Sequence, residues 1–179
     1  LTSLELLAAG IDINFAPVLD VDENTSSIIA DRSFSGLPDE VIKYASEYID
    51  GMHEAGMKSV AKHFPGHGGI KEDSHISLAE DKRTINQLNA KDLKPYIQLN
   101  NKIDAILCGH VLFSNIDKNI PIFSKFWLKE YLKEYINFNG IIFTDDLTMA
   151  GSGNDECKIK ARKAIETGCD MVLICNSRD

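Results

Sequence analysis

The sequence predicts an α/β fold built on a parallel sheet, and two observations support this prediction. Five short apolar segments typical of buried strands alternate along the chain with segments of helical periodicity. Such alternating units form parallel sheets with right-handed crossovers. Polar residues also follow the apolar segments directly, namely Asp20, Lys62 and His63, His110, Asp145 and Asp146, and Asn176.

Two architectures fit this alternation: an open doubly wound sheet, and part of an eight-stranded (β/α)8 barrel. The polar residues at nearly every strand end favour the barrel, because a barrel gathers all its strand ends around one mouth. An open sheet instead concentrates its ligand at a single switch point. Five strands cannot close a standard barrel, so about three strands would be absent. A length of 179 residues suits one domain, and we expect a single catalytic domain over 1–179.

The first half of the chain predicts two helices and two strands. A helix over 2–9 is followed by an apolar strand over 11–19. Residues 39–55 predict an amphipathic helix, because one face carries Val41, Ala45, Tyr48, Ile49 and Met52. Gly56 ends this helix, and 56–61 predict the second strand.

The second half predicts the remaining helices and strands. Thr84 and Gln87 have the spacing of a capping box, so a helix begins there, and Pro95 is expected to break it. Ser124 is expected to cap the next helix. The expected strands are 103–107, 141–143 and 171–174, with a helix over 158–167 before the last of them.

Composition excludes several classes of partner. The net charge is −8, and no basic run is present to neutralise phosphates, so we expect no nucleic-acid partner. No apolar run approaches the roughly 20 residues that a membrane span needs, so we expect no membrane association. The four cysteines show no paired zinc spacing, which favours a reducing, cytoplasmic location over a disulfide framework.

The segment 62–69, Lys-His-Phe-Pro-Gly-His-Gly-Gly, concentrates reactive side chains at the end of the second strand. As a metal site, it would supply His63 and His67 together with His75 and Asp73. That reading is less favoured, because the proline and glycines prevent the helix on which such spacing forms a ligand pair. A phosphate cradle is disfavoured, because the glycines match neither the dinucleotide-binding nor the Walker spacing and no helix follows them. Acid/base chemistry is favoured instead, with Asp73 orienting the imidazole of His75.

Asp145 and Asp146 follow a buried strand directly. They are either aspartates that cap the next element or a nucleophile with an orienting neighbour, and their spacing does not decide between these roles. Arg32 is either a surface side chain or a clamp for a polar substrate.

Four further polar residues have weaker assignments. We interpret Asp20 and Asp22 as structural support through capping or ion pairs. His110 ends a strand and is expected to line the mouth, and His53 is expected to be a surface residue of its helix.

These motifs together resemble the signature of family 3 glycoside hydrolases, specifically the NagZ-type β-N-acetylhexosaminidases. The resemblance covers essentially the whole chain. It rests on segments 14–21 (NFAPVLDV), 31–34 (DRSF), 62–68 (KHFPGHG), 73–75 (DSH), 109–111 (GHV), 143–149 (FTDDLTM) and 168–176 (GCDMVLICN).

The resemblance implies a TIM-like barrel of which this chain carries about the last five strands. It implies that Asp145 is the nucleophile and that His75, paired with Asp73, is the general acid/base. The residues that match sugar-binding positions are Arg32, Lys62 and His63. The implied substrate is terminal β-linked N-acetylglucosamine, taken from muropeptides in cytoplasmic peptidoglycan recycling, and no cofactor or metal is implied.

Two departures from the family pattern stand out. An acidic Gly-Gly segment of an earlier strand is absent, and the loop over 150–156 is short and rich in glycine. The first departure predicts a fragment that is unstable or inactive by itself, because an unclosed parallel sheet exposes apolar edges. Three alternatives stay open: a β-glucosidase of the same family, a metal-dependent hydrolase that uses the histidines, and a sugar-binding module.

Overall fold

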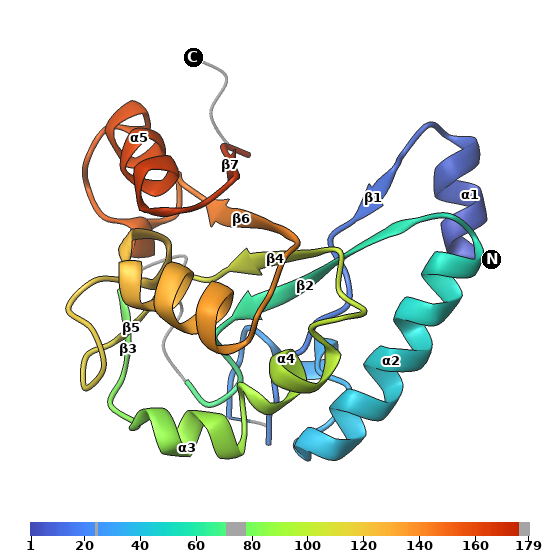
Figure 1. The fold of residues 1–179 in the computed structure, drawn as a ribbon, viewed down its shortest axis with the longest axis horizontal. Helices are drawn as coiled ribbons and strands as arrows, with labels where there is room; N and C mark the ends of the chain where they lie inside the picture. The colour runs from blue at the N-terminus through green and yellow to red at the C-terminus, as the bar shows by residue number, and fades with distance from the viewer. Residues whose placement is uncertain (24, 71–77, 176–179) are drawn as a thin grey trace.

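The computed structural model describes residues 1–23, 25–70 and 78–175. Its main sheet, within these residues, has five parallel strands in the order β1 (Ile13–Asn14), β2 (Lys58–Phe64), β4 (Ala105–Cys108), β6 (Ile141–Asp146) and β7 (Met171–Leu173) (Figure 1). The strands follow one another in chain order, without the reversal that defines a doubly wound sheet. The winding is therefore that of a barrel, as the strand-end residues predicted.

The sheet is strongly curved. The rings of Phe15, just after β1, and Phe143, on β6, meet edge to face with centroids 5.3 Å apart. In a flat sheet these strands would be about 14 Å apart, because β2 and β4 lie between them. The sheet is thus a curled half-barrel, and its concave face is narrow enough for side chains of distant strands to touch.

Apolar residues on the two faces of the sheet form two separate clusters. Successive strand residues point to opposite faces. The larger cluster includes Ala61, Ile106 and Ile142 together with the helices on the convex side. The smaller cluster consists of the residues one position away, on the concave side: Val60, Ala105, Leu107 and Phe143.

Helices cover the convex side of the sheet (Figure 1). The α-helices of the described residues are α1 (Thr2–Ala8), α2 (Pro38–Glu54), α3 (Ile85–Ala90), α4 (Lys94–Leu99) and α5 (Cys157–Thr167). The predicted face of α2 is confirmed for Val41, Ala45, Ile49 and Met52, which are buried, whereas Tyr48, also placed on that face, is exposed. The capping box of Thr84 and Gln87 is also present, and the chain leaves the helical conformation before Pro95 as predicted.

Two elements differ from the predicted ones. The strand expected over 11–19 is regular only over Ile13–Asn14, because the following chain contains Pro17, which cannot donate to the ladder. Beyond it, the backbone N–H of Leu19 still donates to the Lys62 carbonyl at 2.7 Å. The helix expected after Ser124 is a π-helix, Phe126–Tyr135, and Ser124 Oγ accepts from the Trp127 N–H.

A second, two-stranded parallel sheet was not predicted. It pairs β3 (Ala79–Asp81) with β5 (Val111–Phe113). Each strand has three residues, too few to show a period, and its partner lies about thirty residues away in the chain. The short helical turns Ala30–Arg32, Pro121–Phe123 and Ala150–Ser152 were not predicted either.

Asp104 ties the amino-terminal ends of the strands together. Its carboxylate lies 2.6 Å from His53 Nε2 and accepts from Lys58 Nζ at 2.9 Å and from the Ser59 N–H at 3.0 Å. Burial raises the pKa of this carboxyl, but these hydrogen bonds outweigh burial and bring it to about 2. His53 is therefore more than the surface residue expected, because it joins α2 to this cluster.

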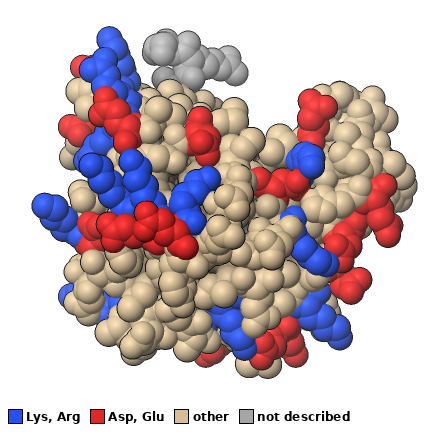
Figure 2. Space-filling view, in the orientation of Figure 1, with Lys and Arg blue, Asp and Glu red and all other residues tan. Residues whose placement is uncertain are grey.

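The surface and the helices are consistent with the composition. In the described part of the chain, none of the helices has the length and apolar character required to cross a membrane. Basic and acidic side chains are interspersed on the face shown in Figure 2, rather than separated into patches of one sign.

Candidate active site

The carboxyl ends of β2 and β6 present Lys62 and Asp145 to the concave face. Lys62 lies two residues after Val60, and Asp145 two residues after Phe143, so each shares the face of its apolar neighbour. The two strands flank β4, and the curl of the sheet brings their ends together.

A pocket of about 210 Å³ opens at this end of the sheet. Its lining residues are Ile28, Ile29, Arg32, Lys62, His63, His67 and Asp145. The structure thus places four residues of the predicted site, Arg32, Lys62, His63 and Asp145, in one pocket. Ile28 and Ile29 were not predicted, because an apolar pair in a polar loop gives no chemical signal. His110 is fully buried after β4 and is not among the described residues that line this pocket.

Asp20 organises the two histidines of this pocket. Its carboxylate is fully buried, lies 2.7 Å from His63 Nδ1 and accepts from the His67 N–H at 2.7 Å. Burial raises the pKa of Asp20, but the charge and hydrogen bond of His63 and the contacts of His67 outweigh burial and lower it below 3.8. The interpretation of Asp20 as structural support is confirmed, and an ionised Asp20 keeps a proton on His63 Nδ1.

Asp145 and Asp146 have different environments, although their spacing in the sequence could not tell them apart. Asp146 is buried, and its carboxylate accepts from the Thr148 N–H, the Thr148 hydroxyl and the Cys175 N–H at 2.7–3.1 Å. Asp145 lines the pocket, and its Oδ1 accepts from the Asp146 N–H at 2.8 Å. Asp146 therefore holds the ends of β6 and β7, while Asp145 faces the space that a ligand would fill.

The side chains of Arg32 and Lys62 line the same pocket as the Asp145 carboxylate. Burial and the nearby charge of Arg32 lower the pKa of Lys62, while the charges of Asp145 and Asp20 oppose that shift. Arg32 is held by its own turn, since Nε and Nη2 donate to the Ile28 carbonyl at 3.2 and 2.8 Å. A neutral polar ligand with several hydroxyl groups matches such a pocket, because it accepts from the cations and donates to the carboxylate.

Asp73, His75 and Asn176 lie outside the described residues. The chain that leads toward the first two is closely packed. A side chain at Gly66 would overlap Asp92, one at Gly68 would overlap the backbone of Val21, and one at Gly69 would overlap Arg83. These glycines therefore allow the chain to pack closely against Asp92, Val21 and Arg83. Close packing explains why glycine occurs at these positions without a phosphate cradle.

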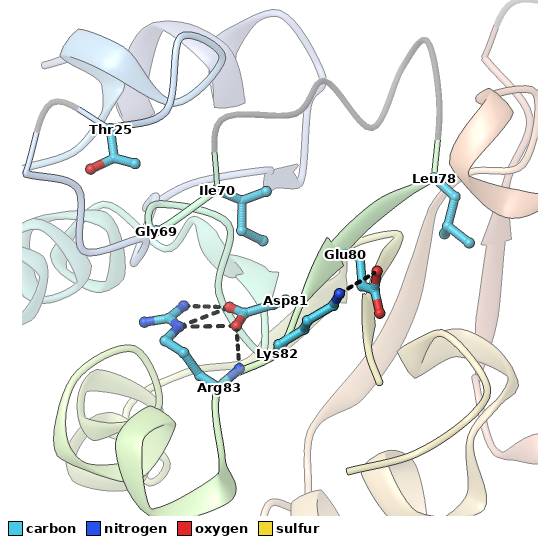
Figure 3. Close-up of a pocket in the computed structure, with 8 residues that line it drawn as sticks. All are labelled: Thr25, Gly69, Ile70, Leu78, Glu80, Asp81, Lys82 and Arg83. Carbon is cyan, nitrogen blue, oxygen red and sulfur yellow. Dashed lines mark hydrogen bonds and ion pairs between the residues drawn. The ribbon is translucent and has the colours of Figure 1, made fainter. Parts of the chain in front are cut away.

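Arg83 and its partners line a second, larger hollow of about 640 Å³ (Figure 3). Its guanidinium donates to Asp81 at 2.6–3.1 Å and to Asp92 at 2.6 Å. Lys82 pairs with Glu80 in the same hollow. These charges are paired with one another, so the smaller pocket, which contains the predicted residues, is the better candidate for chemistry.

The metal interpretation gains no support from the described residues. Among them, no three His, Cys, Asp or Glu side chains form a group able to hold a metal ion. His75 and Asp73, which that interpretation also used, lie outside this set.

Comparison with known proteins identifies the family. Residues 1–179 match the sequence model of the glycosyl hydrolase family 3 N-terminal domain. The chain belongs to glycosyl hydrolase family 3. The five-stranded sheet is accordingly part of the TIM-like barrel of this family, as predicted.

Curated members of family 3 provide similar sequences. The chain is 50% identical to the β-hexosaminidase of Idiomarina loihiensis, covering 99% of this chain and 54% of that protein. It is 45% identical to the β-hexosaminidase of Haemophilus influenzae, over 98% of this chain and 50% of that protein. The chain thus spans about half the length of the curated relatives that it matches.

Solved family 3 structures provide similar folds. NagZ from Neisseria gonorrhoeae, in complex with N-trifluoroacetyl-D-glucosamine, superposes with a TM-score of 0.90 at 42% identity, covering 97% of this chain and 50% of that one. LpqI from M. tuberculosis has a TM-score of 0.88 at 30% identity, covering 97% of this chain and 53% of that one.

Proposed function

We propose that the protein is a retaining exo-glycosidase that removes terminal β-linked N-acetylglucosamine. The observation that carries this proposal is the pocket in which Asp145 faces Arg32, Lys62 and His63. It is supported by relatives named β-hexosaminidase and by the N-acetylglucosamine derivative bound to the gonococcal protein.

The proposed chemistry has two steps. A carboxylate oxygen of Asp145 bonds to the anomeric carbon while the bond to the leaving oxygen breaks, and His75 gives that oxygen a proton. His75 then takes a proton from water, whose oxygen displaces Asp145 and frees the sugar. A histidine suits both steps near neutral pH, and Asp73 would stabilise its protonated form.

The remaining pocket residues would bind the sugar. Lys62 and Arg32 would donate to its hydroxyl groups. His63 is held through Nδ1 by Asp20, so its Nε2 would be directed toward the sugar. Binding energy from such remote contacts can be used to distort the ring toward the transition state.

The natural substrate and location are a finer part of the proposal. We infer a muropeptide that contains N-acetylglucosamine as the substrate, cleaved in the cytoplasm during cell-wall recycling. The support is resemblance to the NagZ-type branch together with a cysteine pattern that suits a reducing compartment.

The first test traps the glycosyl-enzyme. The complete protein is incubated with 5-fluoro-N-acetylglucosaminyl fluoride and analysed by intact mass and peptide mapping. We expect one sugar per protein on Asp145 and none in the Asp145→Asn variant. Hydrolysis without any adduct would instead indicate an inverting or metal-dependent route, and activity unchanged by a chelator would exclude the second of these.

A second measurement separates this activity from that of a β-glucosidase. Hydrolysis of an aryl β-N-acetylglucosaminide is compared with that of the matching aryl β-glucoside. We expect the first to have a kcat/KM at least about a hundredfold higher, because a site that binds an amide discriminates strongly against a ligand without one. Faster hydrolysis of the glucoside would overturn the proposed specificity.

A further inference from the structure

Lys160 is a buried lysine that the proposed chemistry does not use. It lies on α5 and is 5% exposed. Its ammonium donates to the Leu147 carbonyl at 2.5 Å, to Ser152 Oγ at 2.9 Å and to the Gly153 carbonyl at 3.1 Å. An ammonium has three N–H donors, so these neutral oxygens use all of them.

All three acceptors belong to the loop that follows β6. Its first residue, Leu147, comes directly after the two aspartates, and its last, Gly153, ends the turn Ala150–Ser152. The Ser152 hydroxyl also lies within hydrogen-bond distance of the Leu147 and Met149 carbonyls. Lys160 therefore holds both ends of the loop and joins them to α5.

The loop is connected to the Asp145 carboxylate through a single residue, Asp146. Asp145 Oδ1 accepts from the Asp146 N–H at 2.8 Å. The next residue is Leu147, whose N–H donates to the Leu173 carbonyl at 2.9 Å and whose carbonyl accepts from Lys160. Leu147 follows Asp146 directly, so a shift of the loop would reach the Asp146 N–H through the backbone and move the carboxylate that accepts from it. The bond from Lys160 to the Leu147 carbonyl opposes such a shift.

We propose that Lys160 is a positioning residue for Asp145, which it aims by fixing the loop over 147–153. The inference rests on the proposed function, because it assigns Asp145 as the nucleophile. Burial of a cation against neutral oxygens is costly for stability. Correct orientation of the Asp145 carboxylate offsets this cost, since a displacement of about 1 Å at a reacting atom can lower the reaction rate about a hundredfold.

The test measures the rate of glycosyl-enzyme formation per competent molecule. The complete protein and its variants are mixed with 5-fluoro-N-acetylglucosaminyl fluoride and quenched over time. In the measured step the Asp145 oxygen bonds to the anomeric carbon, and fluoride leaves with the electron pair. Intact mass gives both the rate constant and the final labelled fraction. A loss of folded protein lowers the labelled fraction, whereas a misoriented Asp145 carboxylate lowers the rate constant.

We expect Lys160→Met to lower the rate constant at least about tenfold, with Ser152→Ala lowering it less. Lys160→Arg keeps the charge and the donors, and is expected to stay within about threefold of the unsubstituted protein. Lys133→Met is the matched control, because Lys133 donates to the Gly140 carbonyl at the opposite end of β6. It should leave the rate constant unchanged.

Two results would overturn the inference. The first is a Lys160→Met variant that is labelled at the rate of the unsubstituted protein; if that variant does not fold, the same result for Ser152→Ala counts instead. In that case Lys160 does not orient Asp145, and the proposed function stands. If the unsubstituted protein takes up no label, the proposed function fails and the inference fails with it.

Discussion

At the scale of single residues, Asp20 shows how a buried charge can organise a pocket. It reaches the backbone N–H groups of His63 and His67 and the His63 ring from a segment more than forty residues earlier. Its carboxylate therefore fixes the ring of His63 and the backbone at His67 before any ligand arrives, which reduces the ordering that binding must supply.

Replacement of Asp20 by asparagine should destabilise the protein in a pH-dependent way. The folded pKa lies below the ordinary 3.8, so the ionised carboxylate contributes stability above that pH, and the contribution is lost as the pH falls through the folded pKa. Urea denaturation should show a loss of about 2 kcal/mol or more at pH 7 and a smaller difference near pH 3.

The exposed Asp12, replaced in the same way, is the control and should change stability by less than about 0.5 kcal/mol. An Asp20→Asn penalty that stays constant from pH 7 to pH 3 would contradict the linkage between this carboxylate and folding.

At the scale of elements, the Arg83 cluster joins segments that the main sheet does not connect. Asp81 ends β3, Asp92 lies between α3 and α4, and Gly69 packs on the guanidinium after β2. The carboxylate of Asp92 is fully buried. Removal of one partner would leave that charge without compensation, which makes this ion pair different from those on the surface.

We expect Arg83→Met to lower the free energy of unfolding by about 3–5 kcal/mol, since it leaves a buried carboxylate unpaired. Adding Asp92→Asn to this variant should restore part of the loss. Lys94→Met removes the exposed pair with Asp39 and should cost no more than about 1 kcal/mol. Equal losses for the Arg83 and Lys94 variants in urea denaturation would show that burial does not set the strength of these pairs.

At the scale of the whole molecule, the half-barrel leaves apolar residues uncovered. β1 and β7 are the edge strands of the five-stranded sheet in the described residues. Ile11 and Met171, at these edges, are 42% and 48% exposed. Parallel edge strands with apolar neighbours pair readily with other chains.

The 179-residue chain by itself is therefore expected to self-associate or to unfold without a single cooperative transition. Sedimentation velocity over a tenfold range of concentration, together with thermal unfolding followed by circular dichroism, measures both properties. A stable monomer with two-state unfolding would show that the exposed edges do not limit this chain.

The sequence by itself determined the parallel fold and most of the candidate site. The alternation of strands and helices and the polar strand ends are local patterns, and they predicted a barrel winding with Lys62, His63 and Asp145 at one end of the sheet. Arg32 was assigned to the site by the family motifs. Family motifs added roles for Asp73 and His75, which stay predictions.

Only the tertiary structure showed the different environments of Asp145 and Asp146 and placed Asp20 against His63 and His67. Asp146 differs from Asp145 through its contact with Cys175, just after β7, and Asp20 is buried where it meets His63 and His67, more than forty residues later in the chain. The Arg83 and Lys160 contacts likewise join segments that come together on folding. Periodicity reports which face a residue occupies, whereas the partner it meets is set by the packing of distant segments.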